Sequence, residues 1–194
     1  MRGRGDDMSA MNADAGVTGY SSWGKALHWI SALMILFIIP AGIVMTNIGP
    51  GALQNNLYDL HRSFGVAVFV LALARVLVRI AHGAPGPAAG LNAFERFASA
   101  AVHYAMYALL IAMPIGGWLM TSAFRVDVSV FGLFTLPHLV EKNEATFKFF
   151  QQMHFIGGIA MTLLVLMHIG AVIKHTFLSK DTVLWRMLPK SWGG

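Results

Sequence analysis

Apolar residues of this chain are concentrated in four long runs, at about residues 26–46, 62–81, 97–121 and 155–177. Each run is close to the roughly 20 residues that a helix needs to cross the hydrocarbon core of a bilayer. Because lipid offers the backbone no hydrogen-bond partners, such a segment must be helical. The pattern predicts an all-α integral membrane protein, a four-transmembrane-helix bundle occupying about residues 21–190.

The segments outside these runs have different compositions. Residues 1–20 are rich in Gly, Ala, Asp and Ser, which predicts a disordered N-terminal tail. Residues 84–90 form a turn-rich connector with two prolines and two glycines. The connection at residues 122–153 is longer, and its alternation of apolar and polar residues at 126–131 indicates a segment lying at the membrane interface.

Composition also points to lipid as the solvent. Apolar residues make up 56% of the chain and charged residues 12%, about half the usual share in a soluble domain. The absence of cysteine excludes disulfides, iron–sulfur clusters and covalent haem attachment. A cleaved signal peptide is the alternative for the first run. Three preceding aspartates and a run longer than the usual signal core argue against it.

The net charge of +5 could indicate nucleic-acid binding, but the basic residues lie at the ends of the apolar runs. We therefore interpret them as determinants of membrane orientation. Ten of the 14 Lys and Arg residues lie on one side, namely Arg2, Arg4, Lys25, Arg75, Arg79, Arg96, Lys174, Lys180, Arg186 and Lys190. The other side has Arg62, Arg125, Lys142 and Lys148. The positive-inside rule therefore predicts that both termini are cytoplasmic. We call that side inner and the opposite side outer.

Ionisable side chains within membrane helices are costly and are usually functional. Five histidines lie within or at the start of the predicted helices, and a sixth lies at the end of the last one: His28, His61, His103, His154, His168 and His175. For any single histidine the alternative is an interfacial side chain that only forms hydrogen bonds.

The spacing of His154 and His168 argues against that alternative. Fourteen residues at about 100° each give roughly 1400°, only about 40° short of four turns, so both rings project from nearly one face. They are separated by about 21 Å along the helix axis. Two ligands at two depths suit two stacked metal centres, whereas a zinc site would have its ligands about one turn apart.

Each of these histidines needs a partner at equal depth on another helix. His61 begins the second predicted helix on the outer side, where His154 begins the fourth, so the two match in depth. On the inner side, both His28 and His103 match His168. Depth alone does not decide between them.

Small residues lie close to these histidines. Gly42, fourteen residues after His28 and on nearly the same face, is expected at the depth of the outer site, where it leaves room for a flat macrocycle. Near the histidines of the last helix, room for a macrocycle is likewise expected from three glycines, Gly157, Gly158 and Gly170. Close helix packing is an equally good interpretation.

Several short motifs together resemble one known family. They are Ala26-Leu27-His28-Trp29, Leu60-His61-Arg62 with Gly65, Met113-Pro114-Ile115-Gly116-Gly117, Met153-His154-Phe155, Met167-His168, and the closing run from Lys174 to Phe177 and from Lys180 to Pro189. With them the chain resembles the bacterial cytochrome b561 family, which is related to the cytochrome b subunits of nickel–iron hydrogenases and formate dehydrogenases. The resemblance covers residues 20–189, and the closing run is its most specific part.

The resemblance implies a multi-pass protein of the bacterial inner membrane that encloses two b haems, each held by two histidines. It implies that His28 pairs with His168 and that His61 pairs with His154. Many relatives have a second histidine after the one that matches His175. Here that position is Thr176, so a role shared by such a pair is not carried over.

Arginines at the same depths suggest partners for the haem propionates. Arg75 lies fourteen residues after His61, on the same face at inner depth, where an arginine needs an anion. A propionate would supply that anion, and Arg62 is placed to do the same at the outer site. For Arg79 and Lys174 we favour side chains that extend to the lipid headgroups.

Ligation by two histidines fills both axial positions of the iron, which favours electron transfer over ligand chemistry. The resemblance makes quinone or quinol the expected exchangeable substrate of a quinone-linked oxidoreductase, with superoxide or a soluble redox protein as the second partner. An alternative is a haem-bearing membrane anchor subunit of a larger dehydrogenase or hydrogenase-type complex, with residues 122–153 as its docking surface. A helical bundle with purely structural histidines is the third.

Superoxide is an anion that arrives from water, and the outer site is expected to lie close to water. Arg62, together with the basic residues of the outer connection, would attract such an anion. The basic residues of that connection are Arg125, Lys142 and Lys148, and its acidic residues are Asp127, Glu141 and Glu144. The acidic residues weaken this attraction.

Overall fold

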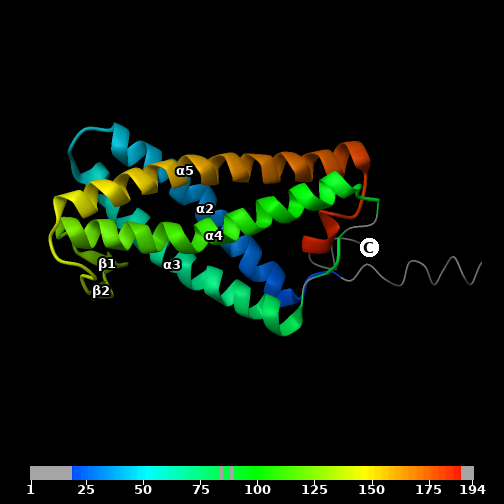
Figure 1. Cartoon of the computed structure of the whole chain (residues 1–194), viewed down its shortest axis with the longest axis horizontal. Coiled ribbons are helices and arrows are strands. Elements are labelled where there is room, and N and C mark those ends of the chain that lie inside the picture. The colour runs from blue at the N-terminus through cyan, green and yellow to red at the C-terminus, as the bar shows by residue number, and fades with distance from the viewer. Residues whose placement is uncertain (1–18, 84, 88–89, 189–194) are drawn as a thin grey trace, which may run out of the picture.

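The computed structural model describes residues 19–83, 85–87 and 90–188, so most of the predicted N-terminal tail lies outside the described residues. Four long helices form the bundle: α2 (Ser22–Asn47), α3 (Ala52–His82), α4 (Ala93–Phe124) and α5 (Glu144–Ile173). A π-helix, η1 (Lys174–Ser179), continues α5, and a 3-10 helix, η2 (Trp185–Met187), follows it. A hairpin of β1 (Val128–Val130) and β2 (Phe134–Leu136) lies at the opposite end (Figure 1). We keep the term inner end for the end at which α2 and α4 begin.

Polar side chains cap the beginnings of three helices. The Ser21 hydroxyl accepts a hydrogen bond from the Gly24 N–H at the start of α2. Asn92 and Glu95 form a reciprocal capping box at the start of α4, and the Asn143 side chain accepts from the Thr146 N–H at the start of α5. These bonds satisfy backbone N–H groups that have no partner within the helix.

The helices are longer than the apolar runs from which they were predicted. α3 begins ten residues before its apolar run and α5 begins eleven residues before. The prediction that His61 and His154 begin their helices is therefore wrong, because each lies more than two turns inside. Hydropathy identifies only the part of a helix that contacts lipid, whereas α3, at about 46 Å, extends beyond the roughly 30 Å hydrocarbon core.

The buried core lies at the middle of the bundle. Val68, Ala72, Leu110 and Met161 form one buried apolar cluster, with Ile35 and other residues of α2 packed against it. Many other large apolar side chains face outward, as lipid-facing side chains do in a membrane protein. All four helices are long and apolar enough to cross a membrane. The predicted all-α, four-helix membrane architecture is confirmed.

The outer hairpin packs against α3 just after His61. β1 and β2 are antiparallel, with Val128 opposite Leu136. The Ser63 hydroxyl donates to the Ser129 carbonyl at 3.1 Å and accepts from the Phe131 N–H at 3.0 Å. The alternation predicted at residues 126–131 thus corresponds to a strand and its turn, and Ser63 holds that strand at the outer end of α3.

Candidate functional site

Each of the four helices has three residues along one face at intervals of seven, one at the inner level, one at mid-depth and one at the outer level. From the inner to the outer level they are His28, Ile35 and Gly42 in α2; Arg75, Val68 and His61 in α3; His103, Leu110 and Gly117 in α4; and His168, Met161 and His154 in α5. Seven residues are close to two helical turns, so each set keeps one face over about 21 Å. The buried core therefore separates two levels of histidine.

Three histidines meet at the inner level. The ring centres of His28 and His168 are 6.2 Å apart, with an interplanar angle of 65°. The His103 ring centre is 5.2 Å from that of His168, at 86°. His103 is exposed, and its Nδ1 donates to the Ser99 carbonyl at 2.6 Å. Both candidates that the sequence left open thus lie beside His168.

Two histidines face each other at the outer level. The ring centres of His61 and His154 are 6.1 Å apart, at 65°. The His61 Nδ1–H donates to the Ile38 carbonyl at 3.1 Å, which leaves its Nε2 without a proton and available as a ligand. The His154 Nδ1 is buried and has no hydrogen-bond partner among the described residues.

These separations fit a metal held between two imidazoles. With metal–nitrogen bonds of about 2 Å, each ring centre lies about 3 Å from the metal, so two opposed rings are roughly 6 Å apart. The pairs His28–His168 and His61–His154 match this spacing. No cluster of His, Asp or Glu within the described ranges suits an ion bound by protein ligands alone. A haem, whose macrocycle supplies the other nitrogens, needs only such a pair.

Glycines allow the neighbouring helices to approach the outer histidines. A Cβ at Gly42 would lie 3.0 Å from His61 Cε1, and a Cβ at Gly117 would lie 3.3 Å from His154 Cε1. Gly42 thus lies at the outer level, as predicted. Gly117 escaped prediction, although it follows His103 by the fourteen residues that separate Gly42 from His28.

The glycines of α5 differ from one another. A Cβ at Gly157 would collide with the Met113 sulfur, so this glycine permits close packing of α4 on α5. A Cβ at Gly158 or Gly170 would meet no atom of a neighbouring helix within 4 Å among the described residues. Helix packing is therefore the better interpretation for Gly157 only.

Arg75 lies at the inner level, as its spacing predicted. Its Nη2 is 3.3 Å from His28 Nδ1, and its guanidinium carbon is 5.2 Å from the centre of the Tyr107 ring. Because a guanidinium has only donors, His28 Nδ1 is the acceptor in this contact. The arginine is thus directly beside a candidate ligand.

Other charged residues near the two levels are mostly paired. Arg62 bonds to Asp59 at 2.5 Å, and Arg125 pairs with Glu141. Lys174, which we expected to extend to the headgroups, instead pairs with Glu95 at 2.5 Å. The outer connection thus offers an approaching anion less net positive charge than a count of its lysines and arginines suggests. Arg79 is exposed, in agreement with the headgroup interpretation.

The family model described as prokaryotic cytochrome b561 matches residues 19–190, which is almost the whole chain. The chain belongs to the prokaryotic cytochrome b561 family. It is 32% identical over 173 residues to cytochrome b561 homolog 2 of Escherichia coli (strain K12), covering 89% of this chain and 92% of that protein. It is 25% identical over 174 residues to the probable superoxide oxidase CybB of Yersinia pestis, covering 90% and 98%.

A third relative is cytochrome b562 of Cereibacter sphaeroides (strain ATCC 17023), which is 27% identical over 175 residues, covering 88% of this cytochrome and 95% of the relative. Membership of the family identifies the chain as a b-type cytochrome of a bacterial membrane that takes part in electron transfer. It also implies haem b as the cofactor. The facing histidine pairs suit that cofactor, because a b-type haem is held without cysteine.

Proposed function

We propose that this cytochrome binds two b haems, one between His28 and His168 and the other between His61 and His154. The observation that carries the proposal is the pair of separations, 6.2 and 6.1 Å, at two levels of the bundle. Haem iron, when bound, alternates between two oxidation states and passes single electrons. Because both levels share α5, the two sites form a two-step path along the membrane normal.

His28 is preferred to His103 as the inner ligand. The separation of His103 from His168, 5.2 Å, is shorter than two opposed imidazoles on one metal require. His28 lies in α2, across from α5, and its ring is half-buried, whereas the His103 ring is exposed. Replacing His28 by Ala should remove the inner haem, and replacing His103 should leave both haems in place.

Arg75 is proposed to bind a propionate of the inner haem. A histidine that ligates iron through Nε2 has its proton on Nδ1 and can no longer accept a hydrogen bond from Arg75. The guanidinium then needs another acceptor at the same depth, and a carboxylate is its strongest partner. Arg62 is proposed for a propionate at the outer site, where it would have to exchange Asp59 for that group.

We further propose that the electrons pass between superoxide on the outer side and quinone within the bilayer. Two superoxide anions would each lose one electron and become dioxygen, while one quinone would gain two electrons and two protons to become quinol. The support is similarity over nearly the full length to a relative named a probable superoxide oxidase. Because Arg125 and Lys148 of the outer connection are paired with Glu141 and Glu144, we expect only a modest dependence of the superoxide rate on salt.

A visible spectrum titrated with redox potential tests the proposal most directly. The purified protein should contain two haems per chain and show low-spin spectra. Quinol should reduce both haems, and superoxide should reduce them rapidly from the oxidised state. Reduction by quinol without reduction by superoxide would contradict the superoxide assignment and retain a quinol-linked carrier. A single haem per chain would contradict the assignment of the two pairs.

A further inference from the structure

The two helices that contribute the inner histidine pair do not form a close helix pair. The close pairs in the bundle are α2 with α3 and α4 with α5. Between α2 and α5 lies an apolar groove of about 130 Å³, lined by Ile35 and Ile39 on one side and by Val165 and Leu166 on the other. Packing of these two helices therefore does not by itself explain the 6.2 Å separation of His28 from His168.

The segment at residues 181–188, which we call the clasp, contacts α2 on both sides of His28. The Lys25 Nζ donates to the Leu188 carbonyl at 2.5 Å. The Trp29 Nε1–H donates to the Met187 carbonyl at 3.0 Å. Lys25 precedes His28 by three residues and Trp29 follows it directly. The clasp thus holds the turn of α2 that presents this histidine.

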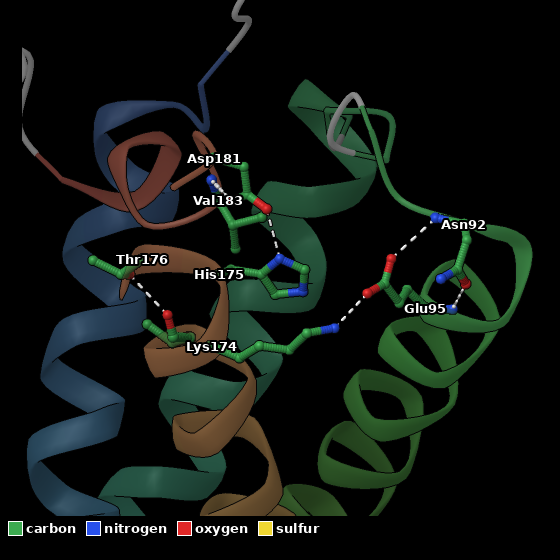
Figure 2. Close-up of polar contacts among 8 residues, drawn as sticks. Asn92, Glu95, Lys174, His175, Thr176, Asp181 and Val183 are labelled. Carbon is green, nitrogen blue, oxygen red and sulfur yellow. Dashed lines mark hydrogen bonds and ion pairs between the residues drawn. The ribbon is translucent and has the colours of Figure 1, made fainter. Parts of the chain in front are cut away.

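The other end of the clasp is attached to the continuation of α5. His175, seven residues after His168, lies in η1, and its Nδ1 is 2.6 Å from a carboxylate oxygen of Asp181. The second oxygen of Asp181 accepts a hydrogen bond from the Val183 N–H at 3.0 Å. Figure 2 shows this carboxylate between the His175 ring and the Val183 backbone. The Asp181 side chain therefore connects η1 to the beginning of the clasp.

Further bonds connect this region to the remaining inner ends. Lys174 reaches across to Glu95, which also belongs to the capping box of α4 (Figure 2). The Arg186 Nη2 donates to the Gly86 carbonyl, in the connection between α3 and α4, at 2.8 Å. The clasp and η1 thus contact the inner ends of α2 and α4 and the connection that follows α3.

We propose that residues 181–188 are a positioning element for the inner haem, anchored to η1 through Asp181 and to α2 through Lys25 and Trp29. The clasp joins the end of α5 to the beginning of α2 and so sets the separation of His168 from His28. Ligand geometry tolerates errors of only about 0.5 Å, so a loosened α2 would lose the inner haem. The outer pair should be retained when the clasp is loosened, because Gly42 and Gly117, which contact its rings, lie at the opposite end of their helices from His28 and His103. This inference rests on the proposed haem ligation.

Asp181→Ala and Trp29→Phe test this role through haem content, without an activity assay. Asp181→Ala should lower the haem-to-protein ratio by about two-fold and remove one step of the redox titration. Trp29→Phe retains an aromatic side chain but removes the indole N–H that bonds to the Met187 carbonyl, so it should weaken retention of one haem. Trp118→Phe is the matched control, because it removes an equivalent indole bond, to the Pro137 carbonyl at 2.9 Å, in the outer connection. It should leave the inner haem unchanged.

Double variants identify the haem that is lost. His61→Ala should retain only the inner haem, and adding Asp181→Ala should remove it. His28→Ala should retain only the outer haem, and adding Asp181→Ala should leave that haem in place, which also shows that the chain still folds. Equal loss in both backgrounds, or no loss in either, would overturn the role of the clasp. A parent protein without two haems would instead contradict the ligand assignment.

Discussion

At the scale of single residues, the outer site depends on two glycines, whose lack of a side chain leaves room for the histidine rings. His61 and His154 each have a glycine of a neighbouring helix against the ring, Gly42 in α2 and Gly117 in α4. Gly in a helix interior is normally less favourable than Ala by about 1 kcal/mol. Both glycines lie in helices with an internal proline, Pro40 and Pro114. We infer that room for the two imidazole rings outweighs the lower helix propensity of glycine at these positions.

Gly117→Ala and Gly42→Ala should weaken the outer haem site. The new methyl group would press on the His154 or His61 ring, from 3.3 and 3.0 Å, and turn it from its partner. We expect partial loss of one haem, measured as the haem-to-protein ratio, and a lower melting temperature. Gly116→Ala is the control, since its Cβ would lie 3.8 Å from Phe150, an ordinary contact. Loss of haem from that variant as well would contradict a local effect on the ring.

Arg75→Leu should lower the midpoint potential of the inner haem. Removing a positive charge near the iron favours the oxidised, more positive form. An interaction of about 1 kcal/mol corresponds to about 40 mV for one electron. The spectrum should remain that of a haem with two histidine ligands. Arg79→Leu, at an exposed position one turn further along α3, should leave the potential unchanged. An unchanged titration in Arg75→Leu would show that this arginine binds no propionate.

At the scale of the elements, the two ends of the bundle are closed by different means. The outer end has a two-stranded hairpin held to α3 by the buried Ser63 hydroxyl. Phe64 of α3 also stacks edge-on against Phe131 of the hairpin turn, at 5.3 Å. The inner end is closed by η1 and the clasp. Each closing element contacts the helix turns next to a pair of histidines.

Ser63→Ala should release the hairpin. The change leaves the Ser129 carbonyl and the Phe131 N–H without their partner, at a cost of about 1–3 kcal/mol for a buried group. Residues 126–136 should then exchange amide hydrogens faster and be cleaved more readily by protease. Ser129→Ala is the matched control, because it removes an exposed hydroxyl and keeps the backbone bonds. Equal exchange in the two variants would contradict this function of Ser63.

At the scale of the whole molecule, the bundle has two levels of histidine separated by an apolar layer. Val68, Leu110 and Met161 fill the layer, each seven residues from the inner-level residue and seven from the outer-level residue of its own helix. The α-helices are exposed along their outer faces, where lipid replaces protein as the packing partner. Among the described residues this layer has no buried charged side chain, which is compatible with the proposed passage of electrons along the membrane normal.

Both termini are predicted to be cytoplasmic, because ten of the 14 Lys and Arg residues lie on that side. A reporter enzyme that works only in the cytoplasm should therefore be active when fused after the last residue, and one that works only outside it should be inactive. A reporter inserted at Gly132, in the hairpin turn, should give the opposite result. Reversed readings would exchange the inner and outer labels, and with them the side on which superoxide is expected.

The sequence alone determined the number of helices and the two levels of histidine. Lipid requires each apolar run to be helical, and the helical period then sets which residues share a face and how far apart they lie. The spacings of His154 with His168 and of His61 with Arg75 follow from this rule alone. The family resemblance rested on motifs within the same segments.

Which side chains meet depends on how the helices pack. Depth left His28 and His103 equivalent, and the rotation and separation of α2, α4 and α5 place their rings at different distances from His168. The polar N-terminal parts of α3 and α5 were not predicted, because hydropathy identifies only the lipid-contacting part of a helix. The backbone hydrogen bonds of both helices continue beyond that part. The clasp depends on contacts between residues more than 150 positions apart, such as Trp29 and Met187. Such contacts cannot be predicted from a local sequence pattern.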